Sequence, residues 1–333
     1  MTRLPPPSTV LSALVLFSIT VLYVEYRISA LSTKQAISAS PSSSPTVVIY
    51  NRVPKTASTT FTNTIAYDLF KQNNFNVVHL NITKNRQILS LADQSALVHN
   101  ISEWRERHPL FLHGHVAYID FARFGLPPPI YINIVREPLE RLLSHYYFLR
   151  YGDNFRVGLK RARAGNNESF DECFSRGGRD CDPSHMWLQI PYFCGQHAFC
   201  SEVGNREALE QAKRTLVEKY LLVGISERMR DSIALLEVTL PSFFKGALSH
   251  YDSLDDDRAH LRNTKNKKPP SAQTLHLVHS TQIYKLEREF YDFAVSIFNA
   301  QFKKATNGTV KAEAALSLPI QFHYEKIKPI VPH

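Results

Sequence analysis

The sequence contains few of the residues that mark fibrous chains and small stapled domains. Its 333 residues include 12 Gly and 4 Cys, which excludes a collagen-like chain and a small disulfide-rich knot. Hydrophobic residues still make up 44% of the chain, so wholesale disorder is excluded as well. No internal repeat is visible. Length and composition together predict a globular protein with one large or two average domains.

Acidic residues are too few to balance the basic ones. The chain has 39 Lys+Arg against 30 Asp+Glu, which is a formal net charge of +9. Such an excess indicates an anionic partner, and composition alone leaves nucleic acid, lipid headgroups, a nucleotide and an acidic polysaccharide open.

Long hydrophobic runs are scarce, and the clearest one is N-terminal: residues 9–24 read TVLSALVLFSITVLYV. This run is slightly short for an average bilayer and matches a thinner membrane of the early secretory pathway. A cleaved signal peptide would use the fair small-residue site at 28–30, whereas an uncleaved anchor needs a spacer, which the Ser/Pro-rich residues 25–45 supply. We favour the anchor. Residues 1–8 are then a cytoplasmic tail and residues 46–333 one lumenal domain, where nucleic acid is disfavoured as a partner.

The cysteines and sequons fit an oxidising lumen. Four cysteines lie close together: Cys173, Cys181, Cys194 and Cys200. They lack the C-x₂₋₄-C spacing of a zinc knuckle, so zinc with His185 and His197 ranks behind disulfides. Three disulfide pairings are open, and joining nearest neighbours would close two small loops. Four Asn-x-Ser/Thr sequons are candidate glycosylation sites: Asn81, Asn100, Asn167 and Asn307.

The domain after residue 45 alternates between strand-like and helix-like patterns. Apolar runs predict strands at 47–51, 111–116, 130–135 and 220–225. Helical spacing predicts helices at 58–69, 138–147, 206–219, 227–240 and 282–302. This order is typical of an α/β domain with a mostly parallel central sheet flanked by helices, here with a loop-rich insertion at 150–203.

The first strand–turn–helix, residues 47–63, has the features of an anion site. Lys55 lies at the turn, and Thr56, Ser58 and Thr59 offer hydroxyls where the helix begins. Free backbone N–H groups and the helix dipole attract an anion at such a point. The turn lacks the glycines of a P-loop. The alternative is an ordinary N-cap by Ser58 beside a solvated lysine.

A second signal follows the strand at 130–135. Arg136 ends that strand at the carboxyl edge of the predicted sheet, where ligands bind in α/β folds. Ser144 lies about two turns along the next helix, on the same side. A guanidinium fork and a hydroxyl suit a second phosphate.

These two motifs resemble the phosphosulfate signatures of sulfotransferases that use 3′-phosphoadenosine 5′-phosphosulfate (PAPS). Further segments, FLHGHVAYIDFARFG at 111–125, YYFLRYGD at 146–153 and WLQIPYFCG at 187–195, are similar to the heparan sulfate 2-O-sulfotransferase family over most of residues 46–328. The resemblance implies a P-loop-NTPase-like sulfotransferase fold and sulfuryl transfer to the 2-hydroxyl of iduronate, and less of glucuronate, in heparan sulfate. It also implies a single-pass type II Golgi membrane protein that needs no metal and forms a homotrimer through a C-terminal tail, here 321–326.

Two alternatives remain. A dermatan or chondroitin uronyl 2-O-sulfotransferase shares the PAPS motifs. A lumenal protein that only binds acidic glycans would explain the charge but not the paired anion sites.

The resemblance assigns catalytic roles to three residues. His115 corresponds to the family's base, His113 is also implicated, and Lys55 would stabilise the bridging oxygen of the leaving nucleotide. Positions i and i+2 of a strand share a face, so we expect both histidines to face the cleft. Gly114 between them leaves room for close approach. Without the resemblance, a hydrogen-bonded structural pair is the stronger interpretation of the two histidines.

The resemblance also assigns binding residues. For PAPS they are Lys55, Thr56, Ala57, Ser58, Thr59, Arg136, Ser144, Tyr251, Thr264 and Lys267. For the uronate chain they are Arg52, Tyr67, His79, Arg161, Arg262 and Lys326. The loop from 251 to 267 should close over the nucleotide, although its run of acidic residues at 255–257 departs from the family pattern.

Overall fold

A computed structural model describes residues 46–82, 87–153, 155–156, 158–255, 258, 264–306 and 322–327, the last of these by backbone alone. The predicted tail, anchor and stem at 1–45 lie outside the described residues, as do Arg262, Asn307 and the side chain of Lys326. Within the described ranges, no helix combines the length and hydrophobicity needed to cross a bilayer.

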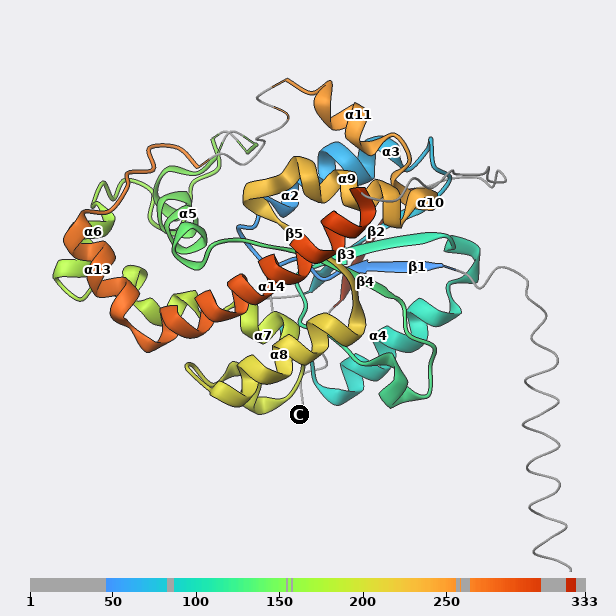
Figure 1. The fold of residues 1–333 in the computed structure, drawn as a ribbon, viewed down its shortest axis with the longest axis horizontal. Helices are drawn as coiled ribbons and strands as arrows, with labels where there is room; N and C mark the ends of the chain where they lie inside the picture. The colour runs from blue at the N-terminus through green and yellow to red at the C-terminus, as the bar shows by residue number, and fades with distance from the viewer. Residues whose placement is uncertain are drawn as a thin grey trace, which may run out of the picture. The chain divides into compact units, whose positions relative to one another are not determined.

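The described residues form a sheet of six strands in the order β5-β4-β1-β3-β2-β6, with every neighbouring pair parallel (Figure 1). The strands are β1 (Val47–Tyr50), β2 (Asn76–Ile82), β3 (Leu110–Gly114), β4 (Ile130–Val135), β5 (Tyr220–Ile225) and β6 (Phe322–Ile327). The predicted α/β class is confirmed. Because the chain moves from β1 to one side for β2 and β3 and then to the other for β4, the strand order switches direction beside β1, where ligands bind in such sheets.

Helices surround this sheet in Figure 1, with α9 and α10 on one side and α7 and α8 on the other. The longer helices are α4 (Leu91–Glu103), α5 (Pro138–Tyr151), α8 (Arg206–Lys219), α9 (Met229–Thr239), α13 (Ala272–Ser280) and α14 (Gln282–Thr306). Short helices are α2 (Ser58–Phe61), α3 (Tyr67–Leu69), α6 (Phe170–Ser175), α7 (Gln189–Cys194), α10 (Pro241–Phe244) and α11 (Ala247–Asp252).

Aromatic side chains fill the space on both faces of the sheet. On one face Phe61, Phe111 and Phe244 are in mutual ring contact. On the other, Tyr220 contacts Tyr131 and Phe193. All these rings are buried, so the sheet and its flanking helices pack as one core.

Several sequence predictions need correction. The strand predicted at 111–116 ends at Gly114, so His115 lies beyond β3 and the argument from alternating strand positions does not apply to it. A Cβ on Gly114 would lie 2.7 Å from that of Leu80, so the close approach is that of β2. The helix predicted at 58–69 is present but contains a π-helical turn, Thr62–Ala66. Strands β2 and β6 were not predicted, because polar residues interrupt their apolar patterns.

The insertion at 150–203 is held by disulfides and ion pairs. The disulfides are Cys173–Cys181 and Cys194–Cys200. They confirm the nearest-neighbour pairing and exclude these sulfurs as thiolate ligands of zinc.

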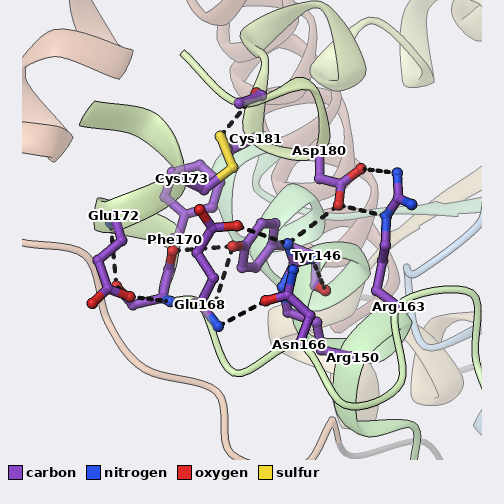
Figure 2. Close-up of polar contacts among 12 residues, drawn as sticks. Tyr146, Arg150, Arg163, Asn166, Glu168, Phe170, Glu172, Cys173, Asp180 and Cys181 are labelled. Carbon is purple, nitrogen blue, oxygen red and sulfur yellow. Dashed lines mark hydrogen bonds and ion pairs between the residues drawn. A yellow bond between two sulfur atoms is a disulfide. The ribbon is translucent and has the colours of Figure 1, made fainter. Parts of the chain in front are cut away.

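Figure 2 shows the ion pairs beside the first disulfide. Arg150 of α5 has a fully buried side chain that stacks on Tyr146, 3.6 Å from the ring centroid. It reaches Glu168 at 3.4 Å and Asp180 at 3.2 Å. Asp180 in turn accepts two hydrogen bonds from Arg163. This network fastens the insertion onto α5.

Candidate active site

A cavity of about 1160 Å³ lies at the carboxyl ends of β1 and β4. Many of its lining residues are basic or hydroxyl-bearing: Arg52, Lys55, Ser58, Thr59, Thr60, His79, His115, Arg136, Ser144, His145, Arg156, Tyr251, Thr264 and Lys267. Such a cleft has the volume and the charge to hold an anionic ligand.

The turn after β1 has an unusual backbone. Lys55 and Ala57 have φ values of 68° and 60°, in the left-handed region that side chains other than glycine seldom adopt. Ala57 is the N-cap of α2 and caps no N–H with its side chain. The alternative of a Ser58 N-cap is therefore wrong, and the first N–H groups of the helix lie beside the cavity. Strain retained at such a turn is typical of a functional site.

Lys55 points into the cavity between two uncharged partners. Its Nζ lies 4.1 Å from the ring centroid of Phe148 and donates to Thr264 Oγ1 at 3.4 Å. Thr264 is fixed in turn by Ser144, 3.1 Å between the two hydroxyl oxygens. Helix α5 and the loop that follows α11 therefore meet at this lysine.

Arg136 lies next to the same turn. Its guanidinium donates to the carbonyl oxygen of Lys55 at 3.3 Å and faces Glu140 and Glu227. Lys267 also contacts the Glu140 carboxylate. Basic groups from three segments thus converge on the end of the cavity nearest α5, as two phosphate sites of one nucleotide would require.

The backbone of Arg136 is held by Gln189, and the buried carboxylate of Glu287 holds the residues on both sides of Gln189. Gln189 accepts from the Arg136 N–H at 2.9 Å and donates to its carbonyl oxygen at 2.8 Å. Glu287 of α14 is fully buried and accepts from the N–H groups of Leu188, at 2.9 Å, and Ile190, at 3.1 Å. Burial raises the pKa of Glu287 to about 7, and the nearby Arg141 opposes that rise.

His115 lies in the cavity wall, just after β3. Its Nδ1 is 2.8 Å from the backbone oxygen of Arg52. A carbonyl oxygen only accepts, so Nδ1 carries the hydrogen and Nε2 is the nitrogen with the lone pair in the neutral ring. This is the tautomer that a general base needs.

His113 is placed differently, beneath the cavity. It is 1% exposed and does not line the cavity. Its Nε2 lies 2.7 Å from the Tyr67 hydroxyl, and its ring stacks on His79 at 4.6 Å. Burial, together with the charge of Arg52, holds the pKa of His113 well below 6.5. The expectation that both histidines face the cleft is wrong for His113.

Arg52 links the histidines. It is 8% exposed, and its side chain donates to Nε2 of His79 at 2.9 Å, while its backbone oxygen accepts from His115. Burial and the charges of Arg52 and Arg156 lower the pKa of His79 to about 4. His79 therefore stays neutral and acts as an acceptor for Arg52 near neutral pH.

Arg161 borders a smaller cavity of about 240 Å³ that shares Arg156 with the main one. Its guanidinium lies 3.4 Å from the buried carboxylate of Asp153 and 4.3 Å from the ring centroid of Phe148. Cations from this loop thus continue the basic surface outward from the main cavity.

A model of the sulfotransferase family matches residues 43–294 of the chain. The chain belongs to the sulfotransferase family. It is 66% identical over 299 residues to heparan sulfate 2-O-sulfotransferase hst-2 of Caenorhabditis elegans, a match that covers 90% of this chain and 92% of that protein. It is 50% identical over 284 residues to heparan sulfate 2-O-sulfotransferase 1 of Homo sapiens and of Gallus gallus, covering 85% of this chain and 78% of each relative. The resemblance found in the sequence is confirmed.

Most residues predicted for the site of this sulfotransferase come together. Those that line the main cavity are Arg52, Lys55, Ala57, Ser58, Thr59, His79, His115, Arg136, Ser144, Tyr251, Thr264 and Lys267. Thr56 does not: it is buried, and its hydroxyl donates to the carbonyl oxygen of Val53. Asn81, predicted as a glycosylation site, lines the cavity, where a glycan would compete with a substrate.

Sequence reasoning missed several residues of this sulfotransferase. His145 and Phe148 line the cavity, and Glu287 and Gln189 fix Arg136 from behind. Phe148 follows Ser144 by four residues, a spacing that places it on the same helix face. Glu287 gave no such signal, because its partners lie about a hundred residues away in the sequence.

Proposed function

We propose that this sulfotransferase transfers a sulfuryl group from PAPS to the 2-hydroxyl of iduronate, and less readily of glucuronate, in heparan sulfate. The observation that carries the proposal is the convergence of two anion-binding motifs and one correctly protonated histidine on a single cavity. The names of its relatives, which are 66% and 50% identical over most of the chain, support heparan sulfate as the acceptor.

The residues have the following roles. The uncapped start of α2, with Ser58 and Thr59, binds the 5′-phosphosulfate, and Arg136 and Ser144 bind the 3′-phosphate. His115 Nε2 accepts the proton of the attacking hydroxyl while that oxygen bonds to sulfur. Lys55 stabilises the bridging oxygen as its bond to sulfur breaks and adenosine 3′,5′-bisphosphate leaves. No step requires a metal.

The acceptor chain is held by a second set of cations, in the wall of the main cavity and in the smaller cavity beside it. Arg52, with its partner His79, and Arg161 face uronate carboxylates and N-sulfates. Tyr67, Arg262 and Lys326 belong to the same proposed set.

The test is disaccharide analysis of heparan and dermatan acceptors after incubation with labelled PAPS. We expect uronate 2-O-sulfate in heparan. Product in dermatan alone would favour the related uronyl enzyme instead. Near wild-type activity of both Lys55→Ala and His115→Ala would refute the assigned mechanism. Failure to bind adenosine 3′,5′-bisphosphate in calorimetry would leave only a glycan-binding protein.

We further propose that the protein is a type II Golgi membrane protein with residues 9–24 as its anchor, and that it forms a homotrimer. Asn100 and Asn167 are exposed, as glycan attachment requires, and Asn307 completes the proposed set.

Strand β6, which lies in the C-terminal tail, pairs in parallel with β2 of the same chain at the sheet edge. Deleting residues 320–333 is expected to abolish trimer assembly, measured by light scattering. An intact trimer after the deletion would refute this part.

A further inference from the structure

One aromatic ring in the active site contacts two cations. The ring of Phe148 on α5 lies 4.1 Å from Lys55 Nζ and 4.3 Å from Arg161 Cζ, each measured to the ring centroid. Lys55 comes from the turn after β1, and Arg161 from the loop after α5. These are the residues that the proposed function places at the donor and at the acceptor.

Two cations this close repel each other. Each cation lies about 4 Å from the same ring centroid, so the two charges are at most roughly 8 Å apart. This distance is about one Debye length at physiological salt, so the repulsion between them is only partly screened. The faces of an aromatic ring carry negative electrostatic potential and attract a cation at such distances. The ring offsets the repulsion without taking a proton and without cancelling either positive charge. A carboxylate in its place would reduce the positive potential that the transferring group needs.

The two cations also make separate contacts with other residues. Lys55 Nζ donates to Thr264 Oγ1, which Ser144 holds from one turn earlier on α5. Arg161 pairs with Asp153, whose side chain is fully buried. Each cation therefore has a partner of its own, and the ring of Phe148 is the contact that they share.

We propose that Phe148 is a positioning residue that holds Lys55 and Arg161 on one ring, and so fixes the spacing between the donor-side lysine and the acceptor-side arginine. The inference rests on the proposed function, because that function assigns the roles of the two cations. It predicts that weakening the ring's electrostatic attraction slows sulfuryl transfer more than it weakens binding of adenosine 3′,5′-bisphosphate.

Fluorination of the ring separates electrostatics from bulk. In the full-length protein, phenylalanine at 148 is replaced by its 4-fluoro, 3,5-difluoro and 3,4,5-trifluoro analogues, which change ring volume little. We expect log kcat to fall steadily along the series, with a total loss of between about 2-fold and 30-fold. Phe148→Leu should lose at least as much.

The same series at Phe124, which packs partly buried against the core and does not line the cavity, should leave kcat unchanged. The proposal would be overturned if kcat stayed constant across the fluorinated series at 148 while the melting temperatures equalled that of wild type.

A second measurement does not depend on activity. The ¹⁹F resonance of 4-fluorophenylalanine at 148 should shift on Lys55→Met and on Arg161→Met. It should not shift on Lys213→Met, because the ammonium of Lys213 lies over a different ring, that of Phe293. If heparan is not sulfated even by wild type, the proposed function fails while these shifts persist. If neither active-site substitution moves the resonance, the shared-ring inference itself fails.

Discussion

His113 and His115 differ by two positions in the sequence and by their whole environment in the structure. His113 is buried against His79 and Tyr67, whereas His115 borders the cavity with its Nδ1 hydrogen donated to Arg52. The pKa of His113 is held well below 6.5 by burial, so it remains neutral and supports its neighbours. The residue suited to proton transfer is the one that meets the cavity.

Substituting each histidine should separate these roles. His115→Asn keeps a donor near the carbonyl oxygen of Arg52 but removes the base, so kcat should fall by at least about 100-fold. Affinity for adenosine 3′,5′-bisphosphate and stability should be unchanged. His113→Ala leaves a cavity and should lower the free energy of unfolding by about 1–3 kcal/mol, with a smaller loss of kcat. Steady-state kinetics and urea denaturation provide the comparison. Equal losses of kcat with unchanged stability would contradict it.

At the scale of elements, α5 joins the active site to the disulfide-bonded insertion. Its cavity side carries Ser144 and Phe148, and its other side carries Tyr146 and Arg150, which hold Glu168 and Asp180 (Figure 2). The loop with Arg161 leaves the end of this helix. The ion pairs around Arg150 therefore stabilise the segment that is proposed to bind the acceptor chain.

Removing the buried arginine should be far more costly than removing an exposed one. Arg150→Met leaves two carboxylates without their buried partner and should lower the free energy of unfolding by about 3 kcal/mol. Arg163→Met is the matched control: its side chain is 50% exposed, compared with 0% for Arg150, and it should cost less than about 1 kcal/mol. Chemical denaturation measures both. Similar losses for the two variants would show that burial does not determine how much each arginine contributes to the free energy of unfolding.

At the scale of the whole molecule, the long helix α14 reaches the segment next to Arg136, at the end of the cavity where we propose that the nucleotide binds. Glu287 on this helix fixes the segment of Leu188 and Ile190, and through Gln189 the backbone of Arg136. The carboxyl group is fully buried, which disfavours its charged form and raises its pKa from 4.5 to about 7.

This raised pKa makes stability depend on pH. A carboxyl whose folded pKa exceeds its unfolded pKa contributes its full stability below the unfolded value, 4.5, and loses it as pH rises through about 7. Glu287→Gln keeps an acceptor for the two N–H groups but does not titrate. Its stability relative to wild type should therefore increase between pH 4.5 and 7, by up to about 3 kcal/mol. Denaturation at a series of pH values tests this. A difference in free energy of unfolding between variant and wild type that stays constant across that range would contradict the raised pKa of Glu287.

The sequence by itself determined the local features of this protein. Apolar periodicity predicted β4, β5, α8 and α14 within a few residues, because packing on a core requires those patterns. The clustering of the cysteines predicted disulfides and left three pairings open, of which the structure has the one between nearest neighbours. The order of strand, turn and helix around Lys55 and Arg136 placed both motifs at one edge of the sheet.

Tertiary structure alone decided which side chains share an environment. It placed His115 past the end of β3 and His113 under the cavity, because the strand stops at Gly114 where β2 approaches closely. It brought Lys55 and Arg161 to one ring and joined Glu287 to the Arg136 segment. These contacts bridge residues that are far apart in the chain, and such pairings depend on how helices and strands pack together, which no local pattern encodes.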